Sequence, residues 1–354
     1  MSDELLNLRK RIDCLDEEIL ARMSERAHCA ERIGALKQGA IYRPEREAQV
    51  LRRLAELNPG PLPEAAVLRI FREIMSACLA VEKPLRVTYL GPAGTFSEGA
   101  ARKQFGAAPE FLPSGAIDDV FRAVEAGNAD YGVVPVENST EGAVGRTLDL
   151  MLSSPLQVCG EVTLRIHQNA LSRCASLGEV KRVYSHAQSL AQCHEWLNRQ
   201  LPGVPRIPVV SNGEAARLAA EEEGACAIAG EAAAEEYGLA TLAQHIEDDP
   251  NNTTRFLVIA KHDAGPSGRD KTSLVCSAAN RPGAMHALLE PLARHGVSMT
   301  KFQSRPARSG LWEYVFYIDV EGHQSDPALG AALAELKERA AFVKVLGSYP
   351  VAAL

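Results

Sequence analysis

The first segment of the chain carries one unbroken apolar stripe, which only a long helix can present on a single face. Apolar residues recur every three or four positions, in step with the helical turn; they are Leu5, Leu8, Ile12, Leu15, Ile19, Met23, Ala27, Ala30 and Ile33. Pro44 stands where a first-turn proline opens a second helix that runs to about Leu57, and Pro63 opens a third helix over residues 64–82. Three helices with so long a first member leave a stripe that one chain cannot cover, so we expect a dimer.

Length, charge and cysteine usage limit the classes of function. The 354 residues suffice for two or three domains, and 46% hydrophobic with 23% charged residues is typical of a soluble globular protein. A net charge of -7 argues against nucleic acid or an anionic membrane as a partner, and no apolar run approaches the length of a membrane span. The amino terminus lacks a secretory pattern, and the scattered cysteines favour reduced thiols. We therefore expect a cytoplasmic protein without disulfides.

From Arg86 onward, short β-rich runs alternate with helical patterns. The runs read RVTYL, YGVVPV, RVYSH, RIPVVS, ACAIAG and RFLVIA, which predicts an α/β domain with largely parallel strands. Ligands bind such domains at the carboxyl ends of strands, where the polar clusters GPAGTFS, ENSTEG and SHAQS fall. The cluster DDPNNTT instead precedes its strand, so it must return across the cleft to join them.

The last part of the chain follows HDAGPSGRD, a segment rich in Gly, Ser and Asp that is typical of a linker. Its order of strand, helix, strand, strand, helix, strand is the ferredoxin-like βαββαβ arrangement. The sequence therefore predicts a multi-domain chain: an all-α helical domain over residues 1–84, a two-lobed α/β domain over 85–262, a linker over 263–270 and a ferredoxin-like domain over 271–354.

Basic residues on the first helix could face solvent or converge on an anion. Arg26 and Lys37 are eleven residues apart, roughly 16 Å and close to three whole turns, so both side chains point the same way. Arg9 and Arg26 are seventeen residues apart, roughly 26 Å, which is too far for one small ligand. If Arg9 takes part in the same site, it must come from the partner chain of an antiparallel dimer. A solvated charged face is the alternative for any such helix.

Two stretches of the first segment, LRKRIDCLDEEILARMSERAHCAERIGALK and YRPEREAQVLRRL, resemble the all-helical chorismate mutase family. The resemblance implies rearrangement of chorismate to prephenate, a unimolecular Claisen shift. The protein then holds two carboxylates and stabilises charge on the breaking ether. The resemblance assigns the carboxylates to Arg26 and to Arg9 of the other chain, the ether oxygen to Lys37, and the remaining carboxylate and hydroxyl region to Arg46 and Glu47.

Glu82 is a position where the chain departs from some chorismate mutases. It stands near the end of the third helix, where some relatives carry Gln as a second donor to the ether oxygen. A carboxylate cannot donate a hydrogen bond, so we expect Glu82 to act as a catalytic residue in its protonated form.

The polar clusters of the second segment are weak signals singly and specific together. GPAGTFSEGAA alone fits either a phosphate loop or an ordinary strand–loop–helix turn, and it does not fit the dinucleotide fingerprint. With VPVENSTEGAV, YSHAQSLAQC and NNTTRF, it resembles the prephenate dehydratase family from Arg86 to about His262. That family converts prephenate to phenylpyruvate, and the loss of hydroxide and carbon dioxide makes the ring aromatic.

The resemblance implies a reaction site of hydroxyls and amides. Thr254 is the implied catalytic residue, since a hydrogen bond donated to the leaving hydroxyl would help it depart. We expect Phe256, two residues along the same strand, to pack in the core. The residues expected to bind and orient the substrate are Asn138, Ser139, Thr140, Ser185, Gln192 and Arg255.

The stretch NRPGAMHALLEPLARHGVSMTKFQSRP resembles the ACT regulatory domain of dehydratases that respond to phenylalanine. It implies that L-phenylalanine binds between the domains of two chains, with its carboxylate on the first amides of the helix that Pro282 and Gly283 open. The stretches Gly-Ala-Met-His and Gln-Ser-Arg-Pro depart from the Gly-Ala-Leu-Val and Glu-Ser-Arg-Pro of relatives. A cut near Gly265 should leave an active dehydratase blind to phenylalanine. The expected effector contacts are Asn280, Gly283, Ala284, Met285, Gln303 and Ser304.

The three resemblances cover nearly the whole chain and imply two successive reactions of phenylalanine biosynthesis, without a metal or another cofactor. We expect chorismate and prephenate as substrates, L-phenylalanine as effector, and a homodimer, with a tetramer as the alternative. One rival is a mutase–dehydrogenase fusion, against which the missing nucleotide fingerprint argues. Another is an amino-acid-binding regulator with inactive catalytic domains, against which the retained Arg9, Arg26, Lys37, Arg46, Asn138 and Thr254 argue. A purely structural dimerisation module is the alternative for the C-terminal domain.

Overall fold

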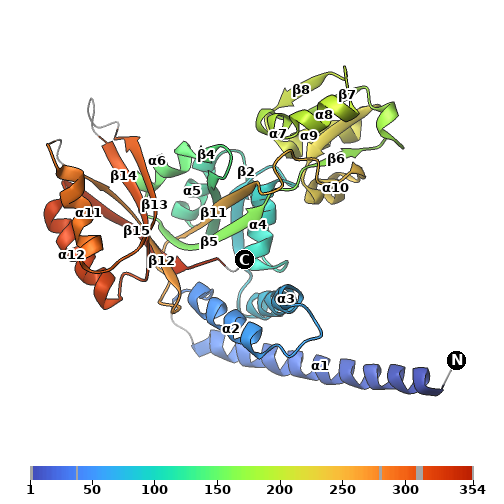
Figure 1. The fold of residues 1–354 in the computed structure, drawn as a ribbon. Helices are drawn as coiled ribbons and strands as arrows, with labels where there is room; N and C mark the ends of the chain where they lie inside the picture. The colour runs from blue at the N-terminus through green and yellow to red at the C-terminus, as the bar shows by residue number, and fades with distance from the viewer. Residues whose placement is uncertain (1–2, 37–38, 279–280, 308–313, 353–354) are drawn as a thin grey trace. The chain divides into compact units, whose positions relative to one another are not determined.

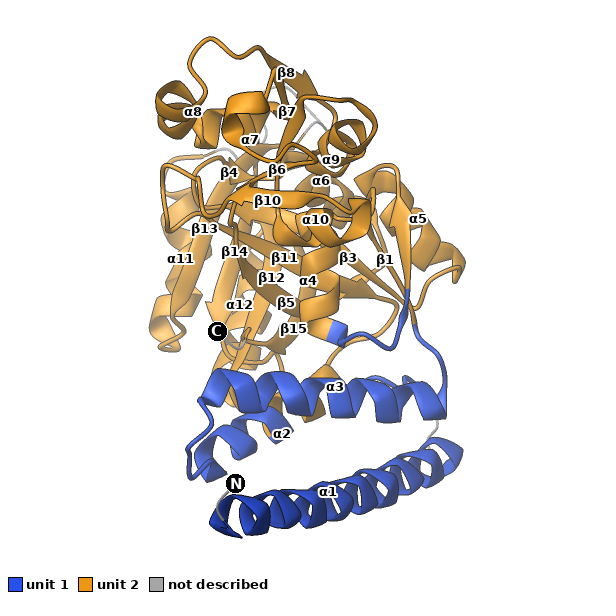
Figure 2. Cartoon of the chain, turned by 90° about the vertical axis from the view of Figure 1, so that its right-hand side faces the viewer, with its two compact units in different colours: residues 1–43, 50–85, 105–110 blue, residues 44–49, 86–104, 111–354 orange. Residues whose placement is uncertain are grey.

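The computed structural model describes residues 3–36, 39–278, 281–307 and 314–352. The chain forms two compact units (Figure 2). The helical unit holds residues 1–43, 50–85 and 105–110, and the α/β unit holds residues 44–49, 86–104 and 111–354. Among the described residues, none of the helices combines the length and the apolar character that a membrane crossing requires.

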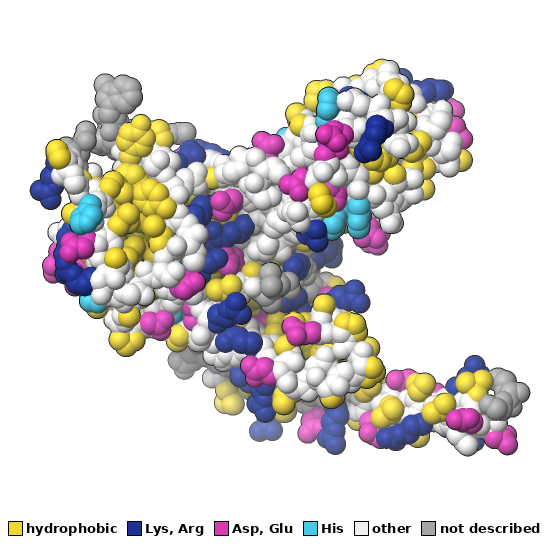
Figure 3. All heavy atoms as spheres, viewed as in Figure 1, with side chains coloured by type: hydrophobic (Ala, Val, Ile, Leu, Met, Phe, Trp, Pro, Cys, Tyr) yellow, Lys and Arg dark blue, Asp and Glu magenta, His cyan; other side chains and the backbone are white. Residues whose placement is uncertain are grey.

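The three expected helices are α1 (Asp3–Leu36), α2 (Pro44–Leu57) and α3 (Glu64–Glu82), and the last two have the bounds expected from the sequence. Pro44 occupies the first turn of α2, where a residue without an N–H leaves no donor unsatisfied. In the described chain α1 has no buried residue. Side chains of its apolar stripe remain at the surface (Figure 3), and Ile12 is 56% exposed. The predicted stripe is therefore present and uncovered in a single chain.

α3 packs against the end of α1 and against residues 105–110. A Cβ at Gly34 would lie 2.9 Å from Glu82 Cγ, so this glycine makes room for the Glu82 side chain. A Cβ at Gly106 would lie 2.5 Å from the Cβ of Ser76, and its φ of +70° also favours glycine. Both glycines are therefore packing positions within the helical unit.

The first lobe of the α/β unit is a sheet of order β2-β1-β3-β11-β5, with β4 beside β3. Figure 1 labels β2, β4, β11 and β5, and Figure 2 labels β1 and β3. Its strands are β1 (Arg86–Leu90), β2 (Glu110–Ser114), β3 (Tyr131–Asn138), β4 (Gly142–Ala143), β5 (Gln157–Arg165) and β11 (Thr253–Ala260). Its helices are α4 (Phe96–Phe105), α5 (Ile117–Ala126) and α6 (Gly145–Ser153).

The second lobe is a sheet of order β10-β6-β9-β7-β8. Its strands are β6 (Asn169–Ser172), β7 (Arg182–His186), β8 (Arg206–Val209), β9 (Ala225–Ala229) and β10 (Ala240–Ala243). Its helices are η1 (Leu177–Glu179), α7 (Ala187–Gln192), α8 (His194–Gln200), α9 (Asn212–Glu221) and α10 (Glu231–Tyr237).

The expectation of largely parallel strands is wrong. β1 is parallel to β3, and β7 is parallel to β8 and β9. However, β11 runs antiparallel to β3 and β5, and β6 runs antiparallel to β9 and β10. The chain leaves the first lobe after β5, builds the second lobe and returns as β11 in the opposite direction. This return brings DDPNNTT to the carboxyl end of β3, as predicted, because Thr254 pairs with Asn138.

Two chain crossings join the lobes, at residues 166–168 and 244–252. His167 Nδ1 lies 2.7 Å from Glu247 Oε1, and the backbone N–H of Gln168 donates to Glu247 Oε2 at 2.8 Å. The rings of His167 and His245 stack with their centroids 4.1 Å apart. The two crossings are therefore bonded to each other rather than being separate loose linkers.

The C-terminal domain is a sheet of order β13-β14-β12-β15 with two helices packed on one face. Its elements follow the predicted βαββαβ order: β12 (Asp270–Ser277), α11 (Ala284–Arg294), β13 (Met299–Pro306), β14 (Tyr314–Glu321), α12 (Pro327–Arg339) and β15 (Phe342–Pro350). The predicted fold class, with a helical domain, a two-lobed α/β domain and a ferredoxin-like domain, is confirmed.

The other face of this C-terminal sheet shares one hydrophobic core with the first lobe. Val275 and Leu346 cluster there with Val134 and Leu257. A Cβ at Gly347 would lie 2.1 Å from a backbone oxygen of the first lobe, so β15 approaches β5 at backbone distance. The C-terminal domain is therefore built onto the first lobe.

The segment between the two domains is also packed. Ala264, Ser267 and Asp270 are buried, and Asp270 accepts hydrogen bonds from the backbone and hydroxyl of Ser267. A cut near Gly265 with loss of the C-terminal domain would expose the shared core. The sequence-based expectation of a working truncated dehydratase therefore has no support in this packing.

Candidate active site

A cavity of about 700 Å³ in the α/β unit collects the polar clusters that the sequence singled out. Its walls come from both lobes: the loop after β1, the ends of β3 and β11, and residues of α7 and α9. Thr254 and Asn138 contribute from the first lobe, and His186 and Gln192 from the second. The topology explains the convergence, because β11 returns beside β3 at the place where the chain crosses between lobes.

Thr254 presents its hydroxyl to this cavity. Its Oγ1 accepts a hydrogen bond from Asn138 Nδ2 at 2.9 Å. Within the part of the chain that the structure describes, Thr254 Oγ1 donates to no protein acceptor. The hydroxyl proton is therefore available to a ligand. Phe256 follows on the same strand face and is 1% exposed, so the expected core position is confirmed, although Phe256 also lines the cavity.

The orientation of the Asn138 amide is fixed by its neighbours. Its Oδ1 accepts from Thr140 N at 3.0 Å, from Thr140 Oγ1 at 2.6 Å and from Glu141 N at 3.1 Å. An oxygen with three donors leaves the amide nitrogen to face the other way, where it donates to Thr254 and to Asn252 Oδ1. Asn138 therefore donates a hydrogen bond to the oxygen of the Thr254 hydroxyl and leaves the hydroxyl proton unused.

Other predicted residues support this pair without lining the cavity. Thr140 receives a hydrogen bond from Gln192 Nε2 at 3.3 Å, which links the second lobe to Asn138. Ser139 Oγ accepts from Thr253 N at 3.0 Å and so anchors the start of β11. Ser185 is fully buried and donates to Ile228 O at 2.7 Å. Of the predicted dehydratase residues, Thr254, Asn138 and Gln192 line the cavity.

Arg255 is the predicted residue that the structure places elsewhere. Strand alternation turns its side chain to the face of β11 opposite Thr254, and it does not line the cavity. Its guanidinium donates to Glu161 at 2.7 Å, to Asp319 at 2.5 Å and to Tyr349 at 2.8 Å. All three guanidinium nitrogens are thus engaged within the protein. Direct substrate binding by Arg255 has no support in this geometry.

Several lining residues escaped the sequence reasoning. Gln168 donates to Ser189 Oγ at 3.0 Å and to Gln192 Oε1 at 3.3 Å. Asn212 Oδ1 accepts from His186 N at 3.2 Å, so it orders the start of α7. Gln168 and Asn212 lie outside the quoted clusters. Asn212 directly follows the run RIPVVS, whereas Gln168 lies next to none of the quoted β-rich runs. Ser114 and Ser211 also line the cavity from outside the clusters, and Thr95, Ser97 and Gln188 line it from within GPAGTFS and SHAQS.

The cavity lining is almost free of charged side chains. Among the described lining residues the only titratable groups are His186 and Glu214. Arg217 donates to the Glu214 carboxylate, which holds the pKa of that group below its usual range. His186 Nδ1 accepts from Gln188 N at 3.3 Å, as a cap of α7. Partial positive charge instead comes from helix starts, because the first residues of α4 and α9 line the cavity.

Cysteines take no part in this site. Burial raises the pKa of the Cys226 and Cys276 thiols to about 12. Burial also raises the pKa of Cys159 and Cys193 well above their usual value. Neutral, buried thiols are poor nucleophiles, so these four cysteines act as small core residues.

The glycine-rich loop after β1 is braced from inside the protein. Gly94 N donates to Glu98 Oε2 at 2.7 Å, and Glu98 is buried and paired with Arg102. A Cβ at Gly94 would lie 2.9 Å from Ala233 of the second lobe, so the loop touches that lobe closely. A side-chain carboxylate thus already occupies one amide of the loop, which favours the ordinary strand–loop–helix turn over a phosphate loop.

The residues predicted for the mutase lie on three helices. Arg9 is exposed and Arg26 is half-buried on the continuous α1, which confirms the single helix used to estimate their separation. Arg46 and Glu47 are in the first turn of α2, and Glu82 is the last residue of α3. Lys37 lies outside the described residues.

The predicted effector residues that the structure describes lie at the start of α11 and on β13. Gly283 has a φ of +75° and precedes α11, and Met285 packs against the core under that helix. Gln303 pairs with Tyr317 and Ser304 with Phe316 on β14, so the two side chains lie on opposite faces of the sheet. Asn280 lies outside the described residues.

Three family models match the chain in succession: chorismate mutase type II over residues 8–83, prephenate dehydratase over 87–264 and ACT domain over 272–338. A curated relative named bifunctional chorismate mutase/prephenate dehydratase, from Neisseria gonorrhoeae, is 58% identical over 357 residues and covers 99% of both chains. One of the same name from Stutzerimonas stutzeri is 51% identical, covering 100% of this chain and 99% of its own. The solved structure of a prephenate dehydratase from Arthrobacter aurescens in complex with L-Phe superimposes with a TM-score of 0.71 at 34% identity, covering 76% of this chain and 90% of that one.

Proposed function

The chain belongs to the bifunctional chorismate mutase/prephenate dehydratase family, and from this premise we propose that it converts chorismate to prephenate and prephenate to phenylpyruvate, under inhibition by L-phenylalanine. The observation that carries the proposal is the Thr254 hydroxyl at the cavity wall, with its acceptor side taken by Asn138. Its proton can then be directed at a leaving hydroxyl of the substrate.

Dehydration needs little more than this hydrogen bond. In prephenate the bond to the ring hydroxyl and the bond to the ring carboxylate break together, and the electron pair of the second bond enters the ring. Because aromatisation drives the reaction, the protein need only stabilise the departing hydroxide. A hydrogen bond donated by Thr254 stabilises that developing charge.

The lining accounts for the recognition of a substrate with two carboxylates. Helix starts and uncharged donors such as Ser97 and Ser211 can receive an anion where a guanidinium is absent from the described lining. Gln168 adds an acceptor, because its buried Oε1 has no protein partner among the described residues. We assign Asn138 and Gln192 to orientation of the substrate, with Ser139, Thr140 and Ser185 supporting them.

The mutase reaction is assigned to the helical domain. Arg26, Lys37 and the partner's Arg9 would hold the substrate's carboxylates and ether oxygen, as the helix length of roughly 26 Å between Arg9 and Arg26 requires. Arg46 and Glu47 would contact the remaining carboxylate and hydroxyl, and Glu82 would donate a second hydrogen bond to the ether. A homodimer supplies the second α1 and also covers the exposed apolar stripe of the first.

Regulation is assigned to the C-terminal domain. The amides at the start of α11, after Gly283, offer a site for the carboxylate of phenylalanine, with Ala284 and Met285 beside it. Asn280 is kept as a proposed contact on the ground of the sequence resemblance alone. Because Gln303 and Ser304 face opposite sides of their sheet, at most one of these side chains belongs to a given wall of that site. We place the enzyme in the cytoplasm, in keeping with its eight free cysteines.

The test is turnover of chorismate by the pure protein. Chorismate should disappear, prephenate should appear transiently and phenylpyruvate should accumulate, in the absence of any added nicotinamide cofactor. The Thr254→Ala variant should stop at prephenate. Added phenylalanine should slow the second step in the wild type.

Each rival predicts another outcome. A mutase–dehydrogenase fusion would oxidise prephenate only when NAD is supplied. A regulator with inactive catalytic domains would bind phenylalanine and leave chorismate unchanged, and that result would refute the proposed activities.

A further inference from the structure

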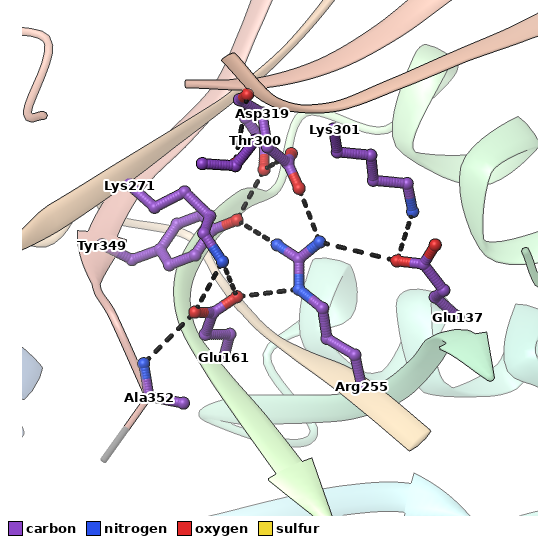
Figure 4. Close-up of polar contacts among 10 residues, drawn as sticks. Glu137, Glu161, Arg255, Lys271, Thr300, Lys301, Asp319, Tyr349 and Ala352 are labelled. Carbon is purple, nitrogen blue, oxygen red and sulfur yellow. Dashed lines mark hydrogen bonds and ion pairs between the residues drawn. The ribbon is translucent and has the colours of Figure 1, made fainter. Parts of the chain in front are cut away.

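A cluster of charged and hydroxyl groups lies on the opposite face of β11 from the cavity (Figure 4). At its centre is Arg255, which follows Thr254 directly in the strand and whose side chain is only 14% exposed. Its partners come from the first lobe, with Glu161 on β5, and from the C-terminal sheet, with Asp319 on β14 and Tyr349 on β15. One side chain thus ties the strand of Thr254 to two strands of another domain.

Arg255, Tyr349 and Asp319 form a closed ring of hydrogen bonds with a fourth residue, Ser273. Arg255 Nη2 donates to Tyr349 Oη at 2.8 Å, and Arg255 Nη1 donates to Asp319 Oδ2 at 2.5 Å. Ser273 Oγ, on β12, donates to Asp319 Oδ1 at 2.5 Å and lies 2.5 Å from Tyr349 Oη. Guanidinium only donates and carboxylate only accepts, so the Tyr349 hydroxyl must donate to Ser273. Every bond in the ring therefore has one possible direction.

Three members of the ring, Ser273, Asp319 and Tyr349, are buried, and the charges around Arg255 are balanced by neighbours. Glu161 also accepts from Lys271 Nζ at 2.9 Å, and Glu137 accepts from Lys301 Nζ at 2.8 Å. Burial, and then the Asp319 carboxylate, raise the pKa of Tyr349 well above its usual value, so the phenol keeps the proton that it donates. Bonds to a buried charge are costly to break, because the partner is left without compensation. The ring therefore holds β11 firmly against the C-terminal sheet.

The strands of Ser273 and Asp319, β12 and β14, contribute from their other face to the hydrophobic core under α11, the helix of the proposed effector site. Ser273 is followed by Leu274, and Asp319 is preceded by Ile318, and both apolar neighbours pack in one cluster with Leu288 of α11. A shift of α11 would therefore move strands whose opposite faces hold Arg255. This is a continuous physical connection from α11 to the residue after Thr254.

We propose that Arg255 is a positioning residue, and that its ring with Tyr349, Ser273 and Asp319 makes the placement of the Thr254 hydroxyl depend on the state of the C-terminal sheet. The inference rests on the proposed role of Thr254 in dehydration and adds the route by which regulation reaches that hydroxyl. An effector alters activity only if it binds two arrangements with different affinity. The ring can be intact in one arrangement and broken in another, because it forms only when all of its members lie within hydrogen-bond distance.

The test breaks the ring while keeping its volume. Tyr349→Phe removes one hydroxyl, and Ser273→Ala removes another at a different corner. In both variants kcat for prephenate should fall about tenfold or more, as expected for a slightly misplaced catalytic group, with KM nearly unchanged. The fraction of activity that remains at saturating phenylalanine should rise by about fivefold or more, the lower end of allosteric coupling. That fraction is a ratio within one preparation, so partial unfolding does not change it.

A matched control lies at the same domain junction. Lys344 Nζ donates to carbonyl oxygens at the end of α6, at 2.9 Å from Met151 O and 3.2 Å from Leu152 O, and touches no member of the ring. Lys344→Met should leave kcat and the response to phenylalanine within about twofold of the wild type, because Thr254 keeps its support. If this variant loses the response as much as Tyr349→Phe does, the junction as a whole is responsible, and the role of the ring is disproved.

A readout without turnover separates this inference from the proposed function. Amide hydrogen exchange of the peptide over residues 253–258 should change on adding phenylalanine in the wild type and in Lys344→Met, but not in the two ring variants. Absence of phenylpyruvate formation in the wild type would refute the proposed function alone. An exchange response that survives in Tyr349→Phe and Ser273→Ala would refute the ring as the connection, whatever the activity.

Discussion

The helical unit and the α/β unit differ in how much of their apolar surface one chain covers. In the described helical unit α1 has no buried residue over 34 positions, and Leu20 is 65% exposed. In the α/β unit β9 is buried throughout, and the cavity around Thr254 is lined by residues of a single chain. The difference supports the proposal that a second α1 completes the mutase site, whereas the predicted dehydratase residues Thr254, Asn138 and Gln192 already meet at one cavity within a chain. The two activities should therefore respond differently to changes in subunit assembly.

The largest expected effect separates the two sites chemically. Thr254→Val keeps the shape of the side chain and removes the hydroxyl, so dehydratase activity should fall by about 10²- to 10⁴-fold. Mutase activity should stay near the wild-type value, because no mutase residue lies on β11. Thr253→Val is the control, since the Thr253 hydroxyl donates to Asn251 O instead of facing the cavity. If both activities fell together in a folded Thr254→Val protein, the separation of sites would be wrong.

A mixing experiment tests whether the mutase site is shared. Arg9→Ala and Arg26→Ala should each lower mutase activity by about 100-fold, since each removes a charged contact to a carboxylate. After subunit exchange, half of the dimers are mixed and one of their two sites is intact, so about a quarter of wild-type activity should return. Arg11→Ala, which removes a side chain paired with Glu18 at 3.6 Å, should behave like the wild type.

The dehydratase activity of the same mixtures should not change. Native mass spectrometry would report whether mixed dimers form. Mixed dimers without recovered mutase activity would place both arginines in one chain's site or outside it.

A charge in the apolar stripe should weaken assembly and so affect one activity. Ile12→Glu buries a carboxylate in the expected contact between two α1 helices, and mutase activity per chain should fall about tenfold on dilution. Dehydratase activity per chain should stay constant over the same range. Glu17→Gln, on another face of α1, is the control. Mutase activity that is independent of concentration in Ile12→Glu would argue that a single chain completes the site.

The smallest expected effect concerns Glu82. If the Glu82 carboxyl donates to the ether oxygen, a side chain of the same shape that also donates should preserve mutase activity. Glu82→Gln should therefore lie within about twofold of the wild type, whereas Glu82→Met, which cannot donate, should lose about fivefold, the value of one hydrogen bond. The rate of chorismate consumption measures this, and dehydratase activity is the internal control. Equal mutase activity in the two variants would remove Glu82 from the mechanism.

The sequence predicted the helical unit almost residue by residue, because periodicity and two prolines define its three helices. It did not predict β5, because Gly160 and the buried charged residue Glu161 interrupt the strand pattern in the sequence. That carboxylate is stable there only because Arg255 and Lys271 reach it from 94 and 110 residues away. Such distant compensation leaves no local trace in a sequence.

The candidate site shows the same limit. Polar clusters stood out because hydroxyls and amides gather at predicted strand ends, and the resemblance to prephenate dehydratases then singled out Thr254, Asn138 and Gln192. Asn212 did not stand out, because it lies inside the ordinary start of α9 and is brought to the cavity by the sheet order of the second lobe. The direction of Arg255 follows from strand alternation, but its carboxylate partners could only be found in three dimensions.

The pair of bonded crossings between the lobes has a mechanical consequence. With His167 held to Glu247 and the C-terminal sheet joined to the first lobe, any change in the angle between the two lobes would have to bend both crossings together. Donors from both lobes face the cavity, so such a change would alter their distances to a bound molecule at the same time. Binding and release of a ligand would then depend on the same two stretches of backbone.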